Sequence, residues 1–278
     1  MYSHFSATDW VTPFGLVFLL AAAVAWWYAR RNAKVIGIDG SHVDLIVPIT
    51  LIVGVVGGTV LAIFMPMDHR LAGEAMNHGI RLRLFGILGT GAIAVFIYSR
   101  LNGLSFRRML DVFALPTITG IAIHRVGCYF AGCCWGDIVA AEPTVPLAAQ
   151  IQTVPWLGRF AHGVHYPPGS LPYEQHLALG LIEPGAIASL PVHPVQLYEV
   201  ALLLLILMML RRVRWQELPR GALAVMTVCA YAFMRFFVEY LRADGSISVG
   251  NLTSTQLQCM VLLTSVILLP GMRRRVVS

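Results

Sequence analysis

Three clusters of polar residues in this chain have residue types and spacings that could support chemistry. The first is the run HRVGCYFAGCCWG, residues 124–136, which combines an arginine, three glycines and three cysteines. The second is HPVQLYE, residues 193–199, and the third is EYLR, residues 239–242. Each cluster lies at an end of a long apolar segment. An ionisable side chain is costly in hydrocarbon, so these clusters are candidate sites.

Arg125 and Arg242 are the candidate anion-binding residues of these clusters. A guanidinium group stays charged and presents a fork of N–H donors that suits phosphate oxygens. The alternative is structural, because Glu199 or Glu239 could pair with each arginine and neutralise a buried charge. The sequence alone allows both anion binding and structural ion pairing.

The thiols allow several interpretations. Cys128, Cys133 and Cys134 lie within seven residues, and two of them are adjacent. They could pack as small apolar groups, form a disulfide on an oxidising face, take part directly in chemistry, or bind a metal. Zinc motifs usually separate neighbouring ligands by two to four residues, so adjacent cysteines suit one tetrahedral ion poorly. We therefore expect no metal site.

His193 is the candidate general base of the second cluster. A histidine near the membrane surface can exchange a proton at neutral pH. The alternative is a helix-capping residue followed by interface anchors. Tyr198 and Glu199 cannot both point the same way as His193 on one helix, so this cluster is expected to serve two directions.

The composition identifies the class of protein. The chain has 278 residues, of which 57% are hydrophobic and 12% charged, whereas a soluble domain has about 25% charged residues. It is therefore expected to be an integral membrane protein. The net charge of +6 is interpreted as a record of membrane topology, and we expect no nucleic-acid partner.

Seven apolar segments are candidate membrane helices, since about 20 residues cross a bilayer. We expect an all-α, polytopic bundle of about seven transmembrane helices, with residues 1–278 forming a single integral membrane domain. Residues 137–192, which are rich in proline, are expected to form a small head or loop on the outer face within that domain. The candidate spans are residues 11–28, 45–64, 84–98, 110–130, 197–210, 221–240 and 255–269.

The basic residues predict the orientation of this bundle. Most lie in alternate loops and at the C-terminus, which by the positive-inside rule are cytoplasmic. The first span has no basic residue before it and three after it, so a retained helix is expected rather than a cleaved signal peptide. The N-terminus is then outside, the C-terminus is cytoplasmic, and all three clusters lie at the outer leaflet. Arg81 and Arg83 fall in an outer loop, where they could bind headgroups or extend to the surface without a site role.

The three clusters resemble the prolipoprotein diacylglyceryl transferase family. The family's Arg-x-Gly signature, its His-Pro-x-Gln-Leu-Tyr-Glu motif and a later Glu, Arg and Asp region occur here in the same order. The chain departs from the family where signature asparagines are replaced by Cys128 and Ala131, and where no histidine occurs near Leu84 in the third span. The matching residues are Arg125, Gly127, Gly132, Trp135, Gly136, His193, Pro194, Gln196, Leu197, Tyr198, Glu199, Glu239, Arg242 and Asp244.

The resemblance implies a bacterial inner-membrane enzyme with its site at the outer leaflet. The implied reaction transfers the diacylglyceryl group of phosphatidylglycerol to the lipobox cysteine of a preprolipoprotein, without a cofactor. Arg125 and Arg242 would stabilise the displaced phosphate, and His193 would be the base or its orienting group, with Glu239 or Glu199 around it. The lipid- and substrate-binding residues would be Gly127, Cys128, Gly132, Gly136, Gln196, Tyr198, Glu199, Arg81 and Arg83.

Three other functions remain open. The chain could bind or transport phospholipid without catalysis, using the same arginines. It could be a related transferase with a different acceptor. A membrane thiol oxidoreductase is the third, although the Cys-x-x-Cys spacing of such proteins is missing.

Overall fold

The computed structural model describes residues 13–64, 84–139, 163–243, 247–249 and 252–268. Within these ranges the regular secondary structure is helical, apart from two short antiparallel strands, β1 (Ile247–Val249) and β2 (Leu252–Thr253). The α-helices are α1 (Pro13–Val35), α2 (Gly40–Phe64), α3 (Leu84–Leu101), α4 (Phe106–Ala131), α6 (Leu171–Ala178), α7 (Val195–Arg211), α8 (Ala222–Val238) and α9 (Ser254–Leu268).

The all-α class and the polytopic membrane character are confirmed. Each of the seven expected spans corresponds to a long helix, and the short helix α6 belongs to the head. Among the described residues, four stretches are long and apolar enough to cross a bilayer: Phe14–Val35, Gly40–Gly57, Phe106–Ala131 and Ala222–Leu241. The helices α7 and α9 have 17 and 15 residues, so the number of crossings stays a prediction.

The helix α4 begins at Phe106 rather than at residue 110. Its Asp111 is buried. The Asp111 carboxylate accepts hydrogen bonds from the backbone N–H groups of Gly221, at 2.7 Å, and Ala224, at 3.0 Å. These N–H groups begin α8 and have no partners within that helix, so a residue of α4 caps α8.

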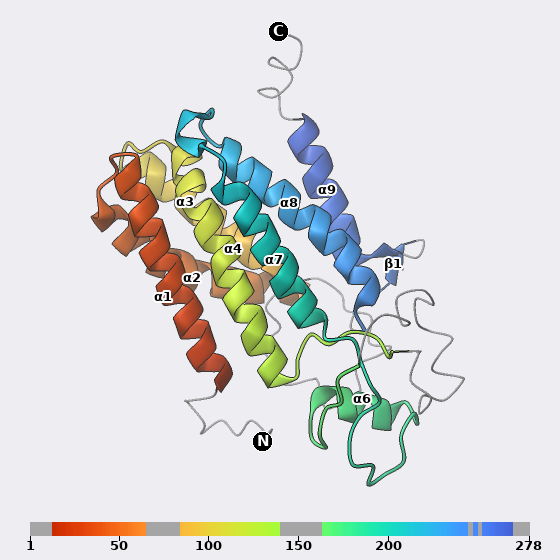
Figure 1. Ribbon diagram of the computed structural model, residues 1–278. Helices are drawn as coiled ribbons and strands as arrows, with labels where there is room; N and C mark the ends of the chain where they lie inside the picture. Colours follow the sequence, from red (N-terminus) through yellow and green to blue (C-terminus); the bar gives the residue numbers. More distant parts are fainter. Residues whose placement is uncertain (1–12, 65–83, 140–162, 244–246, 250–251, 269–278) are drawn as a thin grey trace.

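The helices α4, α7 and α8 share one apolar core. Ile118 and Ala122 of α4, Leu203 of α7, and Tyr231 and Met234 of α8 are buried together. The helix α1 packs along α4, α2 pairs with α3, and α9 packs on α8 (Figure 1). The core thus positions the helices that carry all three polar clusters.

Small residues bring α2 and α3 close together. A Cβ atom added to Gly57 would lie 2.4 Å from Thr90 Cγ2, and one added to Gly54 would lie 3.0 Å from Ile87 Cγ2. Glycine at both positions of α2 therefore permits the close helix packing expected from the sequence.

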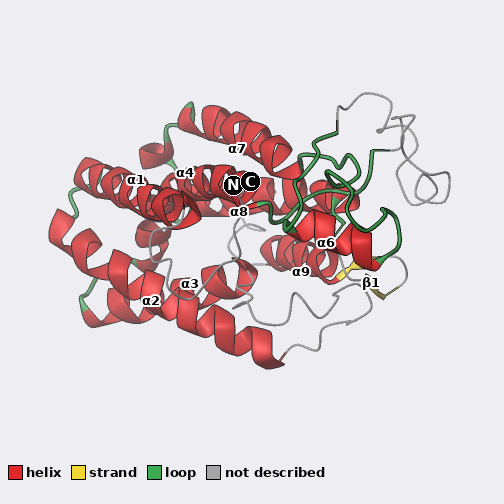
Figure 2. Cartoon of the chain, turned by 90° about the horizontal axis from the view of Figure 1, so that it is seen from below, coloured by secondary structure: helices red, strands yellow, loops and turns green. Residues whose placement is uncertain are grey.

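The polar clusters lie at one end of the bundle. Figure 1 shows that α4 ends, α7 begins and α8 ends at the lower end, next to α6 and its loops, while α9 ends at the top. Seen from that lower end, in Figure 2, α6 and its loops lie to one side of α1, α4 and α7. Helix ends that are far apart in the sequence therefore meet beside the head.

The described part of the head has a small core of its own. Trp135, Ile138, Tyr166, Leu190 and Val192 are buried together. Backbone bridges join Val192 to both Ile138 and Val164. The backbone N–H of Leu190 donates a hydrogen bond to Nδ1 of His176 at 3.1 Å. His176 is buried, and burial lowers its pKa to about 4. The expected outer-face head of residues 137–192 stays a prediction, and its residues 140–162 lie outside the described residues.

Candidate active site

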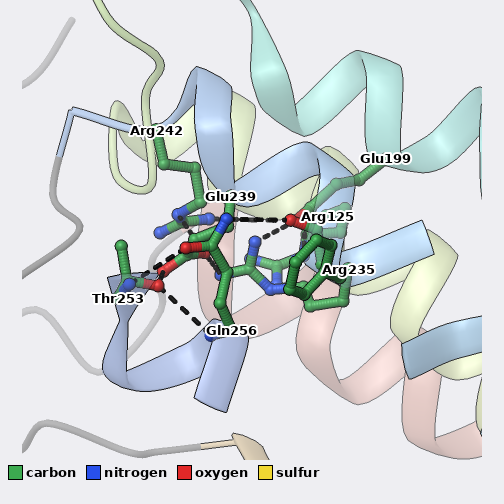
Figure 3. Close-up of polar contacts among 8 residues, drawn as sticks. Arg125, Glu199, Arg235, Glu239, Arg242, Thr253 and Gln256 are labelled. Carbon is green, nitrogen blue, oxygen red and sulfur yellow. Dashed lines mark hydrogen bonds and ion pairs between the residues drawn. The ribbon is translucent and has the colours of Figure 1, made fainter. Parts of the chain in front are cut away.

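Five charged side chains from three helix ends form a buried ion network (Figure 3). Arg125 of α4 pairs with Glu199 of α7, whose carboxylate also lies 3.5 Å from Arg235 of α8. Arg235 Nη2 lies 2.6 Å from Glu239 Oε2. Arg242 lies 3.9 Å from both Glu199 Oε1 and Glu239 Oε2. The pairing of Arg125 and Arg242 with Glu199 and Glu239, one of the two interpretations of these arginines, therefore occurs, and anion binding stays a prediction.

The network is buried and has more positive than negative groups. The exposed fractions of its side chains range from 1% for Glu199 to 9% for Arg125 and Arg235. Three guanidinium groups and two carboxylates carry a net charge of +1. Removing one member of a buried ion network leaves the others uncompensated and typically costs about 3–5 kcal/mol. Such a cluster at a helix end suits an anionic ligand better than it suits apolar packing.

The start of α9 closes the network on one side. Thr253 Oγ1 accepts a hydrogen bond from the backbone N–H of Gln256, and Gln256 Oε1 accepts one from the backbone N–H of Thr253. This reciprocal pair is a capping box, which satisfies N–H groups at a helix start. The Thr253 hydroxyl also donates to Glu239 Oε1 at 3.0 Å (Figure 3). The cap of α9 therefore holds one carboxylate of the ion network in place.

The glycine-rich turn after α4 connects this network to the second cluster. Gly132 ends α4 with φ +64°, a conformation that glycine adopts at little cost. Gly136 pairs with Arg242 in a backbone bridge, and its N–H donates to the carbonyl of His193 at 3.0 Å. Gly127 faces Val17 of α1, where an added Cβ would be 3.1 Å from Val17 Cγ1. These glycines, predicted as substrate-binding residues, permit close backbone packing around the site.

His193 and Gln196 are buried at the start of α7 but face different partners. His193 Nδ1 lies 3.4 Å from the hydroxyl of Tyr198. Burial lowers the pKa of His193 below its ordinary value, which favours the neutral ring. Gln196 donates to the carbonyl of Cys133 at 2.7 Å and so ties α7 to the turn after α4. Glu199 and Glu239, which were expected to orient groups around His193, contact arginines instead. Within the second cluster, Tyr198 therefore faces His193 while Glu199 faces the ion network, so the cluster serves two directions.

The three thiols of the first cluster converge. The Sγ atoms of Cys128, Cys133 and Cys134 all lie within 4.8 Å of one another, and all three cysteines are free. Hydrogen bonds from the Cys128 and Cys133 thiols, together with the charges of Arg242 and Arg125, hold the pKa of Cys134 well below its usual range. The thiol cluster is thus adjacent to the arginines and contains a group that favours the thiolate.

The structure extends the site beyond the residues predicted for it. Arg235, Thr253 and Gln256 were not predicted as site residues. An arginine within an apolar span is itself a signal of a site, and Arg235, Glu239 and Arg242 are spaced so that they recur on one side of a helix. No comparable signal marks Thr253 or Gln256. The predicted residues Arg81 and Arg83 lie outside the described residues.

The packing at Gly136 gives a specific prediction. A Cβ atom added there would lie 2.5 Å from Val195 Cγ2 and 2.7 Å from the carbonyl oxygen of His193. We expect Gly136→Ala to lower the midpoint of thermal unfolding in detergent, with a cost of about 1–3 kcal/mol for overpacking. Gly89→Ala on α3 is the control, because nothing lies within 4 Å of its added Cβ. Equal midpoints for the two variants would contradict this account of the turn.

Comparison with known proteins identifies the family of this chain. The family model for prolipoprotein diacylglyceryl transferase matches residues 5–270. Relatives named phosphatidylglycerol–prolipoprotein diacylglyceryl transferase include one from Nitratidesulfovibrio vulgaris strain DP4, 27% identical over 263 residues, which cover 90% of this chain and 85% of the relative. The Cutibacterium acnes relative is 26% identical over 273 residues (94% and 81%), and the Agrobacterium fabrum relative is 25% identical over 282 residues (93% and 85%). The chain therefore belongs to the prolipoprotein diacylglyceryl transferase family, and is by that membership a membrane transferase of lipoprotein biosynthesis.

Proposed function

We propose that this protein transfers the diacylglyceryl group of phosphatidylglycerol to the lipobox cysteine of a preprolipoprotein. The cysteine sulfur attacks the diacylglyceryl carbon that carries the phosphate oxygen. A C–S bond forms, the C–O bond breaks, and glycerol 1-phosphate leaves with the bonding electrons. The thiol proton passes to a base. This chemistry uses neither an organic cofactor nor a metal.

The positive charge of the buried ion network is the observation that supports this proposal most directly. Three guanidinium groups and two carboxylates leave a net charge of +1 in a cluster whose side chains are at most 9% exposed. A phosphate whose charge increases as the C–O bond breaks is the ligand that such a cluster stabilises most, and stabilisation of developing charge accelerates the reaction.

Arg125 and Arg242 are assigned to the phosphate, and Arg235 to positioning. Of the two arginines that pair with Glu239, Arg235 lies closer, at 2.6 Å. Arg235 also lies 3.5 Å from Glu199. It thereby orients both carboxylates, which in turn orient Arg125 and Arg242. A fixed arrangement of donors requires no reorganisation during the reaction.

His193 is assigned as the base that accepts the thiol proton. It lies at the turn shared with Gly136, whose backbone pairs with Arg242, and its lowered pKa keeps the ring neutral at pH 7. Tyr198 fixes the ring by its contact to Nδ1, which leaves Nε2 as the nitrogen assigned to the thiol proton. This role replaces that of the third-span histidine, which the chain lacks.

We also propose seven crossings with the N-terminus outside and the site at the outer leaflet. The last turns of α1, α3 and α7 contain Lys34, Arg100 and Arg211, respectively, as expected for cytoplasmic ends. A single cysteine introduced at Ile187, which is 93% exposed in the head, should react in intact cells with a membrane-impermeant maleimide. One introduced at Leu101, 80% exposed, should react only after lysis; the reverse pattern would exclude this orientation.

The transferase assignment predicts the behaviour of Arg242→Gln. We expect purified protein with phosphatidylglycerol and a lipobox peptide to add a diacylglyceryl mass to the peptide cysteine, as detected by mass spectrometry. Loss of one charge-stabilising donor should slow this transfer by about 100-fold or more. Arg30→Gln is the matched control, because Arg30 pairs with Asp44 in a partly exposed site away from the network.

Arg125 provides the second arm of this experiment. Arg125→Ala should abolish transfer, and thermal unfolding in detergent reports whether the variant still folds. Arg125→Lys keeps the charge but loses the fork of donors, so its transfer rate should also fall. Full activity in Arg125→Ala would refute the assignment of this residue. Phosphatidylglycerol binding without any peptide modification in the wild type would instead favour lipid handling without catalysis.

The role of His193 predicts a pH profile. The neutral ring is the base, and burial lowers its pKa, so transfer should persist below pH 6.5 and fall only as the pH drops through that lowered pKa. His193→Gln should reduce the rate at pH 7 by about 100-fold or more and flatten the acidic limb of the profile. An unchanged acidic limb in this variant would show that His193 has a structural role alone.

A further inference from the structure

We propose that Cys128, Cys133, Cys134 and His124 form a binding site for one thiophilic metal ion of the Zn²⁺ type. This site lies beside the ion network and is distinct from the proposed transfer chemistry, which requires no metal. It revises the expectation, drawn from the spacing of the cysteines, that the chain has no metal site.

The spacing of the sulfur atoms is close to that of a metal site. All three Sγ atoms lie within 4.8 Å of one another. A tetrahedral zinc with Zn–S bonds of about 2.3 Å places two thiolates about 3.8 Å apart. Side-chain rotations that move each sulfur by a fraction of an ångström would therefore bring the three into bonding distance of a common centre.

The backbone explains how adjacent cysteines can share one ion. Gly132 leaves α4 with φ +64°, and Cys134 has φ +63°, which is a rare conformation for a residue with a side chain. The backbone N–H of Cys133 bonds to the carbonyl of Cys128 at 3.1 Å, so the chain folds back over the end of the helix. The left-handed conformations of Gly132 and Cys134 turn the chain so that the side chains of Cys133 and Cys134 both lie near Cys128. A strained conformation of this kind costs about 1–3 kcal/mol and is typical of functional sites.

His124 supplies the fourth donor from within α4. It precedes Cys128 by one helical turn, and its Nε2 lies 3.6 Å from Cys128 Sγ. Two ligands of a tetrahedral zinc, one nitrogen and one sulfur, are separated by about the same distance. Phe14 and Phe18 of α1 contact the ring edge to face, with centroids 5.3 and 6.0 Å away. Three thiolates with one imidazole are a known structural zinc set, and soft thiolates select Zn²⁺ or Cu⁺ over Mg²⁺ or Ca²⁺.

The charge of the bound site also suits its surroundings. Three thiolates and one Zn²⁺ have a net charge of −1, and the adjacent arginine network has a net charge of +1. Cys133 and Cys134 are half-buried, and Cys128 is buried. Binding would release the protons of those thiols that are still protonated. The ion would fix the turn that carries Gly136 and thereby the backbone to which Arg242 pairs.

The test uses full-length protein purified in detergent under anaerobic, reducing conditions. After removal of metal, titration with Co²⁺ should give thiolate-to-cobalt charge transfer and a tetrahedral visible spectrum that saturate at one ion per chain, and Zn²⁺ should displace the cobalt. Cys133→Ser and His124→Gln should each weaken Co²⁺ binding about 10-fold or more. Cys229→Ser and Cys259→Ser are the matched controls, since both residues lie in other helices, and should bind normally.

A second measurement needs no variant. Alkylation of the wild-type protein with and without Zn²⁺, followed by peptide mass spectrometry, should show protection of Cys128, Cys133 and Cys134 but not of Cys229. Absence of cobalt charge transfer, equal alkylation in both samples, or a native disulfide within the cluster would each overturn the proposal. Because peptide lipidation is measured separately, failure of the metal site leaves the transferase assignment intact, and the reverse also holds.

Discussion

Burial of Glu199 among three arginines is the constraint on which the rest of the site depends. This carboxylate is 1% exposed and receives contacts from Arg125 of α4, Arg235 of α8 and Arg242 after α8. A charge so deeply buried is tolerated only with close partners, so the end of α4, the start of α7 and the end of α8 must lie at the same depth. The shared apolar core of these helices supplies that alignment, and the cap of α9 holds Glu239 in the network.

The membrane class, the helical spans and the convergence of the three clusters could be predicted from the sequence, because each follows from a local pattern. An apolar run of about 20 residues predicts a span, and a charge at its end predicts a site. The participation of Thr253 and Gln256 could not be predicted, because a capping box satisfies a helix start wherever it occurs. Its contact with Glu239 depends on how α9 packs on α8. The bonds from α8 to Asp111 could not be predicted either, because they depend on how α8 packs on α4.

The glycines and cysteines show how one motif can combine two functions. Three glycines permit close packing in this motif: Gly127 packs against α1, and Gly132 ends α4. Gly136 packs against the backbone of His193. The cysteines between them occupy the inside of the turn thus formed. The family resemblance places asparagine at the Cys128 and Ala131 positions, so this chain keeps the backbone of the motif while it changes the donors inside it. A conserved fold can therefore carry altered chemistry at the same turn.

Asp111 has a mechanical consequence for the proposed reaction. It joins α4 to the first turn of α8, while the ion network joins the opposite ends of the same two helices. A displacement of α8 along α4 would have to break both attachments at once, so the two attachments together oppose sliding of these helices. Room for the two acyl chains of the proposed substrate would then come from lateral movement of other helices.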